Sequence, residues 1–306
     1  MLVPRSGRIG LLKSLKGRTA VKSEIDWRAH GQHGNGRARE STEDAQRPSS
    51  WTCQRDAPAA KVVDMSTSSV LWRRAVAEGV PFESEPAFPA QPYGLPIPNQ
   101  VLRESSSVGN LDAFFAIGEA WALVVSHFLP DRPLVLDMGC GCGKLARFLS
   151  LNPGLRYVGV DVFRPAIDWC RKTFSALPGD RFRFEHFDGY SAVYNPGGKV
   201  SPTEYVLPCA AGSVDVTVCA SLFTHLLLPD CMHYLAELSR VLKPHGRAIV
   251  SLHTQPAQGA RFSGDETRID IAPAYFSELA AEAGLAAKEE IGLIYGQDVY
   301  LFERPA

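Results

Sequence analysis

Three glycines and two aspartates, regularly spaced, are the residues of this chain best suited to hold a ligand. Residues 135–144 read Val-Leu-Asp-Met-Gly-Cys-Gly-Cys-Gly-Lys, so Asp137 precedes three alternating glycines. Glycine is needed where the backbone takes a positive φ or comes into contact with a ligand. Asp161 follows 18 residues after the last of these glycines. That spacing suits a carboxylate that accepts hydrogen bonds from ribose hydroxyls, so the pattern predicts a nucleoside ligand.

The details of this glycine loop separate the classes of nucleotide-binding protein. In a dinucleotide fingerprint the third glycine comes one residue later, and the loop binds a diphosphate. Here the carboxylate of Asp137 would repel a diphosphate but attract an ammonium or sulfonium group. A Walker loop is excluded because Lys144 is followed by Leu145 rather than Ser or Thr, and position 138 is Met. The alternative role for Asp137 is a helix cap.

A second segment that could take part in catalysis is Ser-Leu-Phe-Thr-His at residues 221–225. His225 is its one titratable side chain. An unperturbed histidine has a pKa near 6.5, which suits removal of a proton from an attacking hydroxyl or amine. The alternative is that His225 bonds a backbone carbonyl and orders the loop. Cys140 and Cys142 flank a glycine, but no second Cys or His pair stands at ligand spacing, so we expect no metal site.

Strands and helices alternate around these segments, which predicts the fold that positions them. The expected strands are residues 133–138, 155–160, 181–187, 214–219, 247–252, 286–294 and 298–303. The expected helices are residues 111–128, 165–174, 230–242 and 273–283, with a further one through Leu145, Phe148 and Leu149 after the glycines. Regular alternation with apolar strands predicts an α/β fold: a doubly wound, seven-stranded, mainly parallel, Rossmann-like sheet with helices on both faces. Only three residues separate the closing pair, so the last strand should run antiparallel.

Composition divides the chain into parts of different character. Residues 1–64 hold 12 Lys or Arg against 7 Asp or Glu, with no sustained apolar period. We therefore expect 1–64 to be a disordered extension, with a start at Met65 or a transit peptide as alternatives. Residues 65–108 are expected to be an extended, Pro-rich arm, and residues 109–306 the folded domain. The net charge is −1, and no apolar run approaches the length of a membrane span.

The glycine loop and three other segments resemble class I S-adenosylmethionine-dependent methyltransferases. Residues 135–143 look like the first motif of that family, and Asp161 matches its ribose-binding acid. Residues 213–221 match its fourth strand and residues 237–246 the segment before its fifth. Two further segments, Tyr-Asn-Pro-Gly-Gly at 194–198 and Ser-Leu-Phe-Thr-His-Leu at 221–226, resemble a bacterial small-molecule subgroup. The resemblance covers about residues 100–306.

The resemblance implies S-adenosylmethionine as the cofactor and assigns roles by position. The expected cofactor-binding residues are Asp137, Gly139, Cys140, Gly141, Gly143, Asp161, Val162, Asp188, Gly189, Ala220 and Ser221. Candidates for the acceptor side are Arg103, Phe115, Tyr194 and Phe223, with His225 as the candidate base. A surface position is the alternative for Arg103, and a core position the alternative for Phe223.

The expected reaction is an in-line transfer of a methyl group to an O, N or C atom of a small molecule. The alternatives are a nicotinamide-dependent oxidoreductase and a non-catalytic S-adenosylmethionine-binding scaffold or sensor. Residues 65–306 are acidic overall and carry no basic stripe, so we expect no nucleic-acid partner. We also expect no membrane partner and a cytoplasmic location. The sequence leaves the acceptor and the oligomeric state open.

Overall fold

The computed structural model describes residue 79, residues 81–83 and residues 94–306. The centre of the described part is a seven-stranded sheet in the order β3-β2-β1-β4-β5-β9-β8. Its strands are β1 (Leu134–Met138), β2 (Arg156–Asp161), β3 (Phe182–His186), β4 (Val214–Cys219), β5 (Leu242–Leu252), β8 (Ala286–Ile294) and β9 (Gln297–Glu303). All pairings from β3 to β5 are parallel, whereas β9 runs antiparallel to both of its neighbours. The predicted topology, including the antiparallel last strand, is confirmed.

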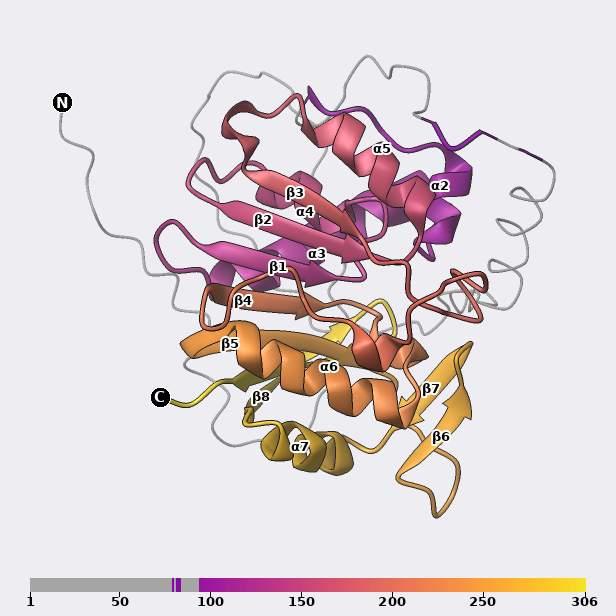
Figure 1. Cartoon of the computed structure of the whole chain (residues 1–306), viewed down its shortest axis with the longest axis vertical. Coiled ribbons are helices and arrows are strands. Elements are labelled where there is room, and N and C mark those ends of the chain that lie inside the picture. The colour runs from indigo at the N-terminus through magenta and orange to yellow at the C-terminus, as the bar shows by residue number, and fades with distance from the viewer. Residues whose placement is uncertain (1–78, 80, 84–93) are drawn as a thin grey trace, which may run out of the picture. The chain divides into compact units, whose positions relative to one another are not determined.

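Helices cover both faces of this sheet, as predicted (Figure 1). One hydrophobic cluster packs α3 (Leu111–His127), α4 (Lys144–Leu149) and α5 (Arg164–Phe174) against one face. A second cluster packs α6 (Leu228–Val241) and α7 (Pro273–Glu282) against the other. Successive side chains of a strand point to opposite faces and so lie in different clusters: Val135 lies in the first and Leu136 in the second. The buried strands therefore contribute to a core on both sides.

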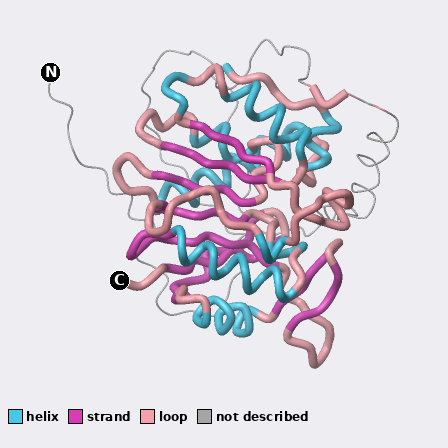
Figure 2. The backbone as a smooth tube through the Cα atoms, viewed as in Figure 1, coloured by secondary structure: helices cyan, strands magenta, loops and turns pink. Residues whose placement is uncertain are grey.

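Two elements differ from the sequence-based expectation. A short helix, α2 (Gln100–Ser105), lies within the expected extended arm, and Asn99 accepts a hydrogen bond from Leu102 N at its start. Leu95 and Leu102 are buried in the same cluster as α3, so no break in packing separates the end of the arm from the domain. A hairpin of β6 (Phe262–Asp265) and β7 (Arg268–Ile271) stands apart from the main sheet (Figure 2). The predicted extension 1–64 lies outside the described residues.

Candidate functional site

The glycine loop joins the end of β1 to the start of α4, at the carboxyl edge of the parallel strands. Gly139, Gly141 and Gly143 have φ values of +76°, +51° and +76°. This left-handed region is one that residues with a Cβ rarely adopt. The amides of Gly139 and Cys140 both donate to the carbonyl of Val160, at 2.8 and 3.1 Å, so the loop is tied to the end of β2. The alternating glycines therefore have the conformational role that the sequence predicted.

The closest approach at Gly141 is to the chain itself. A Cβ on Gly141 would lie 2.4 Å from Oγ of Ser106, in the connection between α2 and α3. That hydroxyl also accepts a hydrogen bond from the amide of Cys142 at 3.0 Å. The ammonium of Lys144 donates to the carbonyl of Ser106 at 2.6 Å. The end of the arm thus packs over the loop, a contact that the sequence analysis did not foresee.

Asp161, at the end of β2, holds the loop from the other side. Its Oδ2 accepts the amide of Gly141 and its Oδ1 the amide of Phe163, both at 2.8 Å. Burial raises the pKa of Asp161, and the two amide bonds oppose that rise. A carboxylate has about four acceptor positions, so the amides of Gly141 and Phe163 do not use all of them. Asp161 therefore holds the loop in place and can still accept hydrogen bonds from a ligand at the carboxyl edge of the sheet.

Asp137 is the more deeply buried of the two acids, with 2 % of its surface exposed. The hydroxyl of Tyr157 donates to its Oδ2 at 2.5 Å. Burial raises the pKa of Asp137 to about 7; the bond from Tyr157 opposes the rise and the charge of Asp161 adds to it. No helix-capping bond from Asp137 is present at α4, whose first turn is preceded by Gly143. A buried acid that has a pKa near 7 and lies beside a glycine loop is suited to bind a cationic group.

The segment after β3 folds back on itself around Asp188 and Gly189. Asn195 donates to Oδ1 of Asp188 at 3.2 Å and to the carbonyl of Gly189 at 3.0 Å. A Cβ on Gly189 would lie 2.1 Å from the ring of Phe187, so this position accepts only glycine. Next to this turn, Nε2 of His186 lies 3.1 Å from the carbonyl oxygen of Val162. The structure thus brings Val162, Asp188 and Gly189 to the carboxyl ends of β2 and β3.

Ser221 follows β4 and is held in a left-handed conformation, with φ at +59°. Its amide donates to Oγ of Ser251 at 2.8 Å, and its Oγ accepts Nε2 of Gln297 at 2.8 Å. Ser251 in turn donates to Oε1 of Gln297 at 2.6 Å. Ala220 precedes this closed ring of bonds and is half-buried. Ser251 and Gln297 were missed by the sequence analysis, because only the pairing of β5 with β9 brings them together.

His225 lies in a single 3₁₀ turn, Phe223–His225, and contacts two other segments. Its Nδ1 is 2.8 Å from the carbonyl oxygen of Glu266, at the tip of the β6–β7 hairpin. That oxygen only accepts, so Nδ1 carries the proton and Nε2 presents its lone pair. Nε2 faces the hydroxyl of Tyr194 at 3.5 Å, and the two rings meet edge-on. Burial lowers the pKa of His225, so the imidazole is neutral near pH 7.

The other three acceptor-side candidates lie elsewhere. Arg103 is buried, and its guanidinium donates to the carbonyls of Gly109 and Pro98 at 2.9 and 2.5 Å. Phe115 packs edge-on against Phe148 between α3 and α4. Phe223 is buried in the second cluster with its ring edge-on to that of Phe276. The structure places these three side chains in packing contacts, and their expected role on the acceptor side stays a prediction.

Two further features of the described ranges, 94–306 with residues 79 and 81–83, concern metal ions and membranes. Within them no group of three or more His, Cys, Asp or Glu side chains is placed to hold a metal ion. None of the helices there is long and apolar enough to span a membrane. Cys140 and Cys142 are both buried, and burial raises the pKa of each thiol.

The family of this segment is decided by comparison with known proteins. Residues 136–248 match the model of a family described as a methyltransferase domain. The matched segment runs from β1 into β5 and contains the glycine loop, Asp161 and His225. Residues 136–248 are therefore identified as a methyltransferase domain, in line with the resemblance to class I S-adenosylmethionine-dependent methyltransferases. The match is shorter than the expected range of about residues 100–306.

A curated relative supports the same assignment for this methyltransferase domain. A malonyl-[acyl-carrier protein] O-methyltransferase of Magnetococcus marinus is 41 % identical over 75 residues, which is 24 % of this chain. The chain spans 27 % of the length of that relative.

Solved methyltransferase structures are similar at low identity. A 1,6-didemethyltoxoflavin-N1-methyltransferase of Burkholderia thailandensis is 16 % identical, with 82 % of this chain and 93 % of that chain covered and a TM-score of 0.48. A TehB-like methyltransferase of Corynebacterium glutamicum is 17 % identical, with 78 % and 97 % covered and a TM-score of 0.45.

Proposed function

We propose that the chain transfers a methyl group from S-adenosylmethionine to an O, N or C atom of a small-molecule acceptor. The observation that carries this proposal is the pairing of two acids with the glycine loop. Asp137 is the second-last residue of β1, Asp161 ends β2, and the amide of Gly141 in the loop donates to Asp161. Both acids thus lie at the carboxyl edge of the parallel strands, where open α/β sheets bind their ligands.

The residues present fit this cofactor, which supplies a methyl group on a sulfonium that a nucleophile can displace. Asp137 would bind its amino group, because a cation compensates the buried carboxylate. Asp161 would accept the ribose hydroxyls through the acceptor positions that the amides of Gly141 and Phe163 leave free. Gly139 and Gly141 would let the backbone approach the methionine part.

The remaining cofactor contacts are proposed along the edge of the sheet. Val162, Asp188 and Gly189 would lie near the ribose and adenine, at the ends of β2 and β3. Cys140 and Gly143 would contribute backbone in the loop, and Ala220 and Ser221 would bound the site beyond β4. The ring of bonds from Ser251 and Gln297 fixes the backbone of Ser221. Fixed backbone there holds the reacting groups in line and excludes water.

On the acceptor side, His225 is proposed as the base and Tyr194 as a substrate contact. The carbonyl of Glu266 keeps the proton on Nδ1, so Nε2 is free to accept one. Nε2 would take the proton of an attacking hydroxyl or amine, and the Tyr194 hydroxyl beside it would orient the acceptor. The competing role is structural, since the bond from Nδ1 also ties the loop to the hairpin.

Calorimetry on the purified chain tests the cofactor proposal. We expect S-adenosylmethionine and S-adenosylhomocysteine to bind, and NAD not to bind. Asp161→Ala should weaken S-adenosylhomocysteine by about 1.5–3 kcal/mol, the value of hydrogen bonds to a charged group. Asp168→Ala, on the exposed side of α5, is the matched control. Binding of NAD without S-adenosylhomocysteine would contradict the proposal.

Methyl transfer itself is tested by incubating the chain with methyl-labelled cofactor and a cell metabolite extract. Label in a small molecule is the expected result. Once that acceptor is known, His225→Ala should lower turnover by about 10²–10⁴ while the cofactor affinity is kept. Cofactor binding with no transfer to any component would instead favour a non-catalytic sensor.

A further inference from the structure

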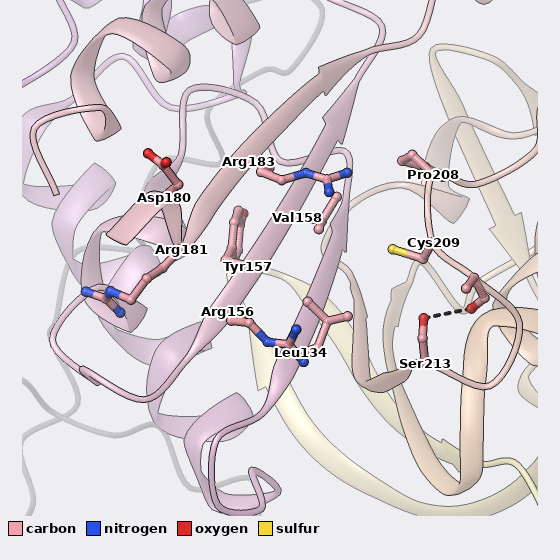
Figure 3. A pocket seen from close by; sticks show the side chains of 11 residues that line it. Leu134, Arg156, Tyr157, Val158, Asp180, Arg181, Arg183, Pro208, Cys209 and Ser213 are labelled. Carbon is pink, nitrogen blue, oxygen red and sulfur yellow. Dashed lines mark hydrogen bonds between the residues drawn. The ribbon is translucent and has the colours of Figure 1, made fainter. Parts of the chain in front are cut away.

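A cavity of about 340 Å³ opens at the edge of the sheet opposite the glycine loop (Figure 3). It is lined by the first residues of strands β1 and β2 and by residues around the start of β3. Its opposite wall is the segment that leads into β4, including Cys209 and Ser213. None of the residues proposed above to bind cofactor or acceptor lines it. The cavity is therefore a feature separate from the methyl-transfer site.

The cavity exists because of an unusual connection between β3 and β4. In doubly wound folds a parallel crossover generally carries a helix that covers the sheet. Here residues 187–213 contain only the 3₁₀ turn Pro202–Glu204. The far wall is nevertheless held in place, because Arg240 donates to the carbonyls of Cys209 and Leu207, both at 3.1 Å. This wall faces the first residues of β1 and β2, where Arg156 is exposed and Leu134 is half-buried.

Strand register places two guanidinium groups on the face of the sheet that borders this cavity. Leu134 pairs with Arg156, and Val158 pairs with Arg183, so Arg156, Val158 and Arg183 share one face of the sheet. In Figure 3 the labelled side chains of Arg156 and Arg183 flank Val158.

These two arginine side chains make few hydrogen bonds or ion pairs with other described residues. Within the part of the chain that the structure describes, Arg156 makes no side-chain hydrogen bond or ion pair. Arg183 has one partner there, Glu185 at 3.6 Å, and its side chain is 58 % exposed.

The remaining charges leave the cavity positive. Arg181 also lines it, although its guanidinium donates to the carbonyls of Asn152 and Leu155 at 2.8 and 3.1 Å. Asp180 is the single carboxylate in the lining, against three guanidinium groups. Guanidinium groups in this arrangement recognise phosphate through paired charged hydrogen bonds.

We propose that this cavity, lined by Arg156 and Arg183, binds a small phosphorylated molecule at the amino-terminal edge of the sheet. The phosphate bridges the two guanidinium groups, and Val158 with Leu134 contacts the apolar part of the ligand. A volume of 340 Å³ lies within the size range of small-molecule sites.

Calorimetry at low ionic strength tests the site with inorganic pyrophosphate and glucose 6-phosphate as probes, and with glucose as the uncharged comparison. We expect both phosphates to bind and glucose to give no signal. Arg156→Gln and Arg183→Gln should each weaken phosphate binding about tenfold, and the double variant more. Both side chains are exposed, so the fold is retained, and unchanged S-adenosylhomocysteine binding confirms it.

Arg261→Gln is the matched control, because Arg261 is an exposed arginine that does not line the cavity. It should leave phosphate binding unchanged. Equal weakening in this control would show that phosphate responds only to the overall charge, and the proposal would be overturned. Absence of binding by both phosphates would overturn it as well.

Discussion

At the scale of single residues, the buried carboxyl group of Asp137 makes the free energy of unfolding depend on pH. Its pKa of about 7 lies above the ordinary value of 3.8, so the folded chain keeps a proton that the unfolded chain releases between pH 4 and 7. The free energy of unfolding therefore falls across that range and levels off above pH 7. Asp137→Asn does not titrate, and Asn still accepts the bond from Tyr157. We expect the variant to be more stable than the wild type by about 3–5 kcal/mol at pH 8.

Urea unfolding of both proteins between pH 4 and pH 8 measures this difference. It should be small at pH 4 and grow towards pH 7. A difference that stays constant over the whole range would show that Asp137 is ionised in the folded chain at every pH tested. The same variant should bind S-adenosylmethionine more weakly, because the compensating charge is gone.

The imidazole of His225 gives a second prediction at this scale. Histidine nitrogen resonances should show a proton on Nδ1 and none on Nε2 at pH 6.5, because burial lowers the pKa and the carbonyl of Glu266 fixes the tautomer. The groups that face this ring are Glu266, Tyr194 and His253. A doubly protonated ring at pH 6.5 would remove His225 as a base.

The acids and glycines of the loop could be identified from the sequence because their spacing along one strand–loop–helix unit is local. Ser106, Gln297 and Glu266 could not, because each reaches the site from a distant segment. Their contacts depend on how the arm, the last strand and the hairpin pack. The burial of Arg103 and Phe223 also depends on distant packing, which their residue types alone do not show.

At the scale of elements, the β6–β7 hairpin joins two segments of the acceptor side. Its tip residue, Glu266, accepts the amide of Ala192 through Oε2 at 2.6 Å and bonds His225 through its carbonyl. Glu266→Ala should therefore speed hydrogen exchange at Ala192 and its neighbours by about tenfold, the effect of losing one charged hydrogen bond. Glu266→Gln keeps an acceptor oxygen and is the matched control. Equal exchange rates in Glu266→Ala and the wild type would show that the side chain does not hold this segment.

The regular strands and helices followed from apolar periodicity, but the hairpin did not. Its strands are short and mix polar with apolar side chains, as in Phe-Ser-Gly-Asp for β6. Such a sequence carries no clear period of two. α2 was missed because the prolines before it dominated the expectation for the whole arm, although Asn99 provides a helix start.

At the scale of the whole molecule, the folded core of the described residues begins near Leu95. Removal of residues 1–64 should leave both the melting temperature and the affinity for S-adenosylhomocysteine unchanged, because that segment lacks the apolar residues to join a core. Scanning calorimetry of the shortened chain measures the melting temperature, and titration calorimetry measures the affinity. A fall of several degrees would mean that the segment docks on the domain.

The position of β9 has a consequence for biosynthesis. This strand lies between β5 and β8, yet it is made after both. While the ribosome is still adding residues 297–303, β5 has an open edge and β8 has no strand to pair with. The hydrogen bonds that fix Ser221 also cannot all form before Gln297 has been made. A nascent chain therefore completes its sheet and this part of its site only after β9 has left the exit tunnel, and until then it exposes an edge that chaperones would have to shield.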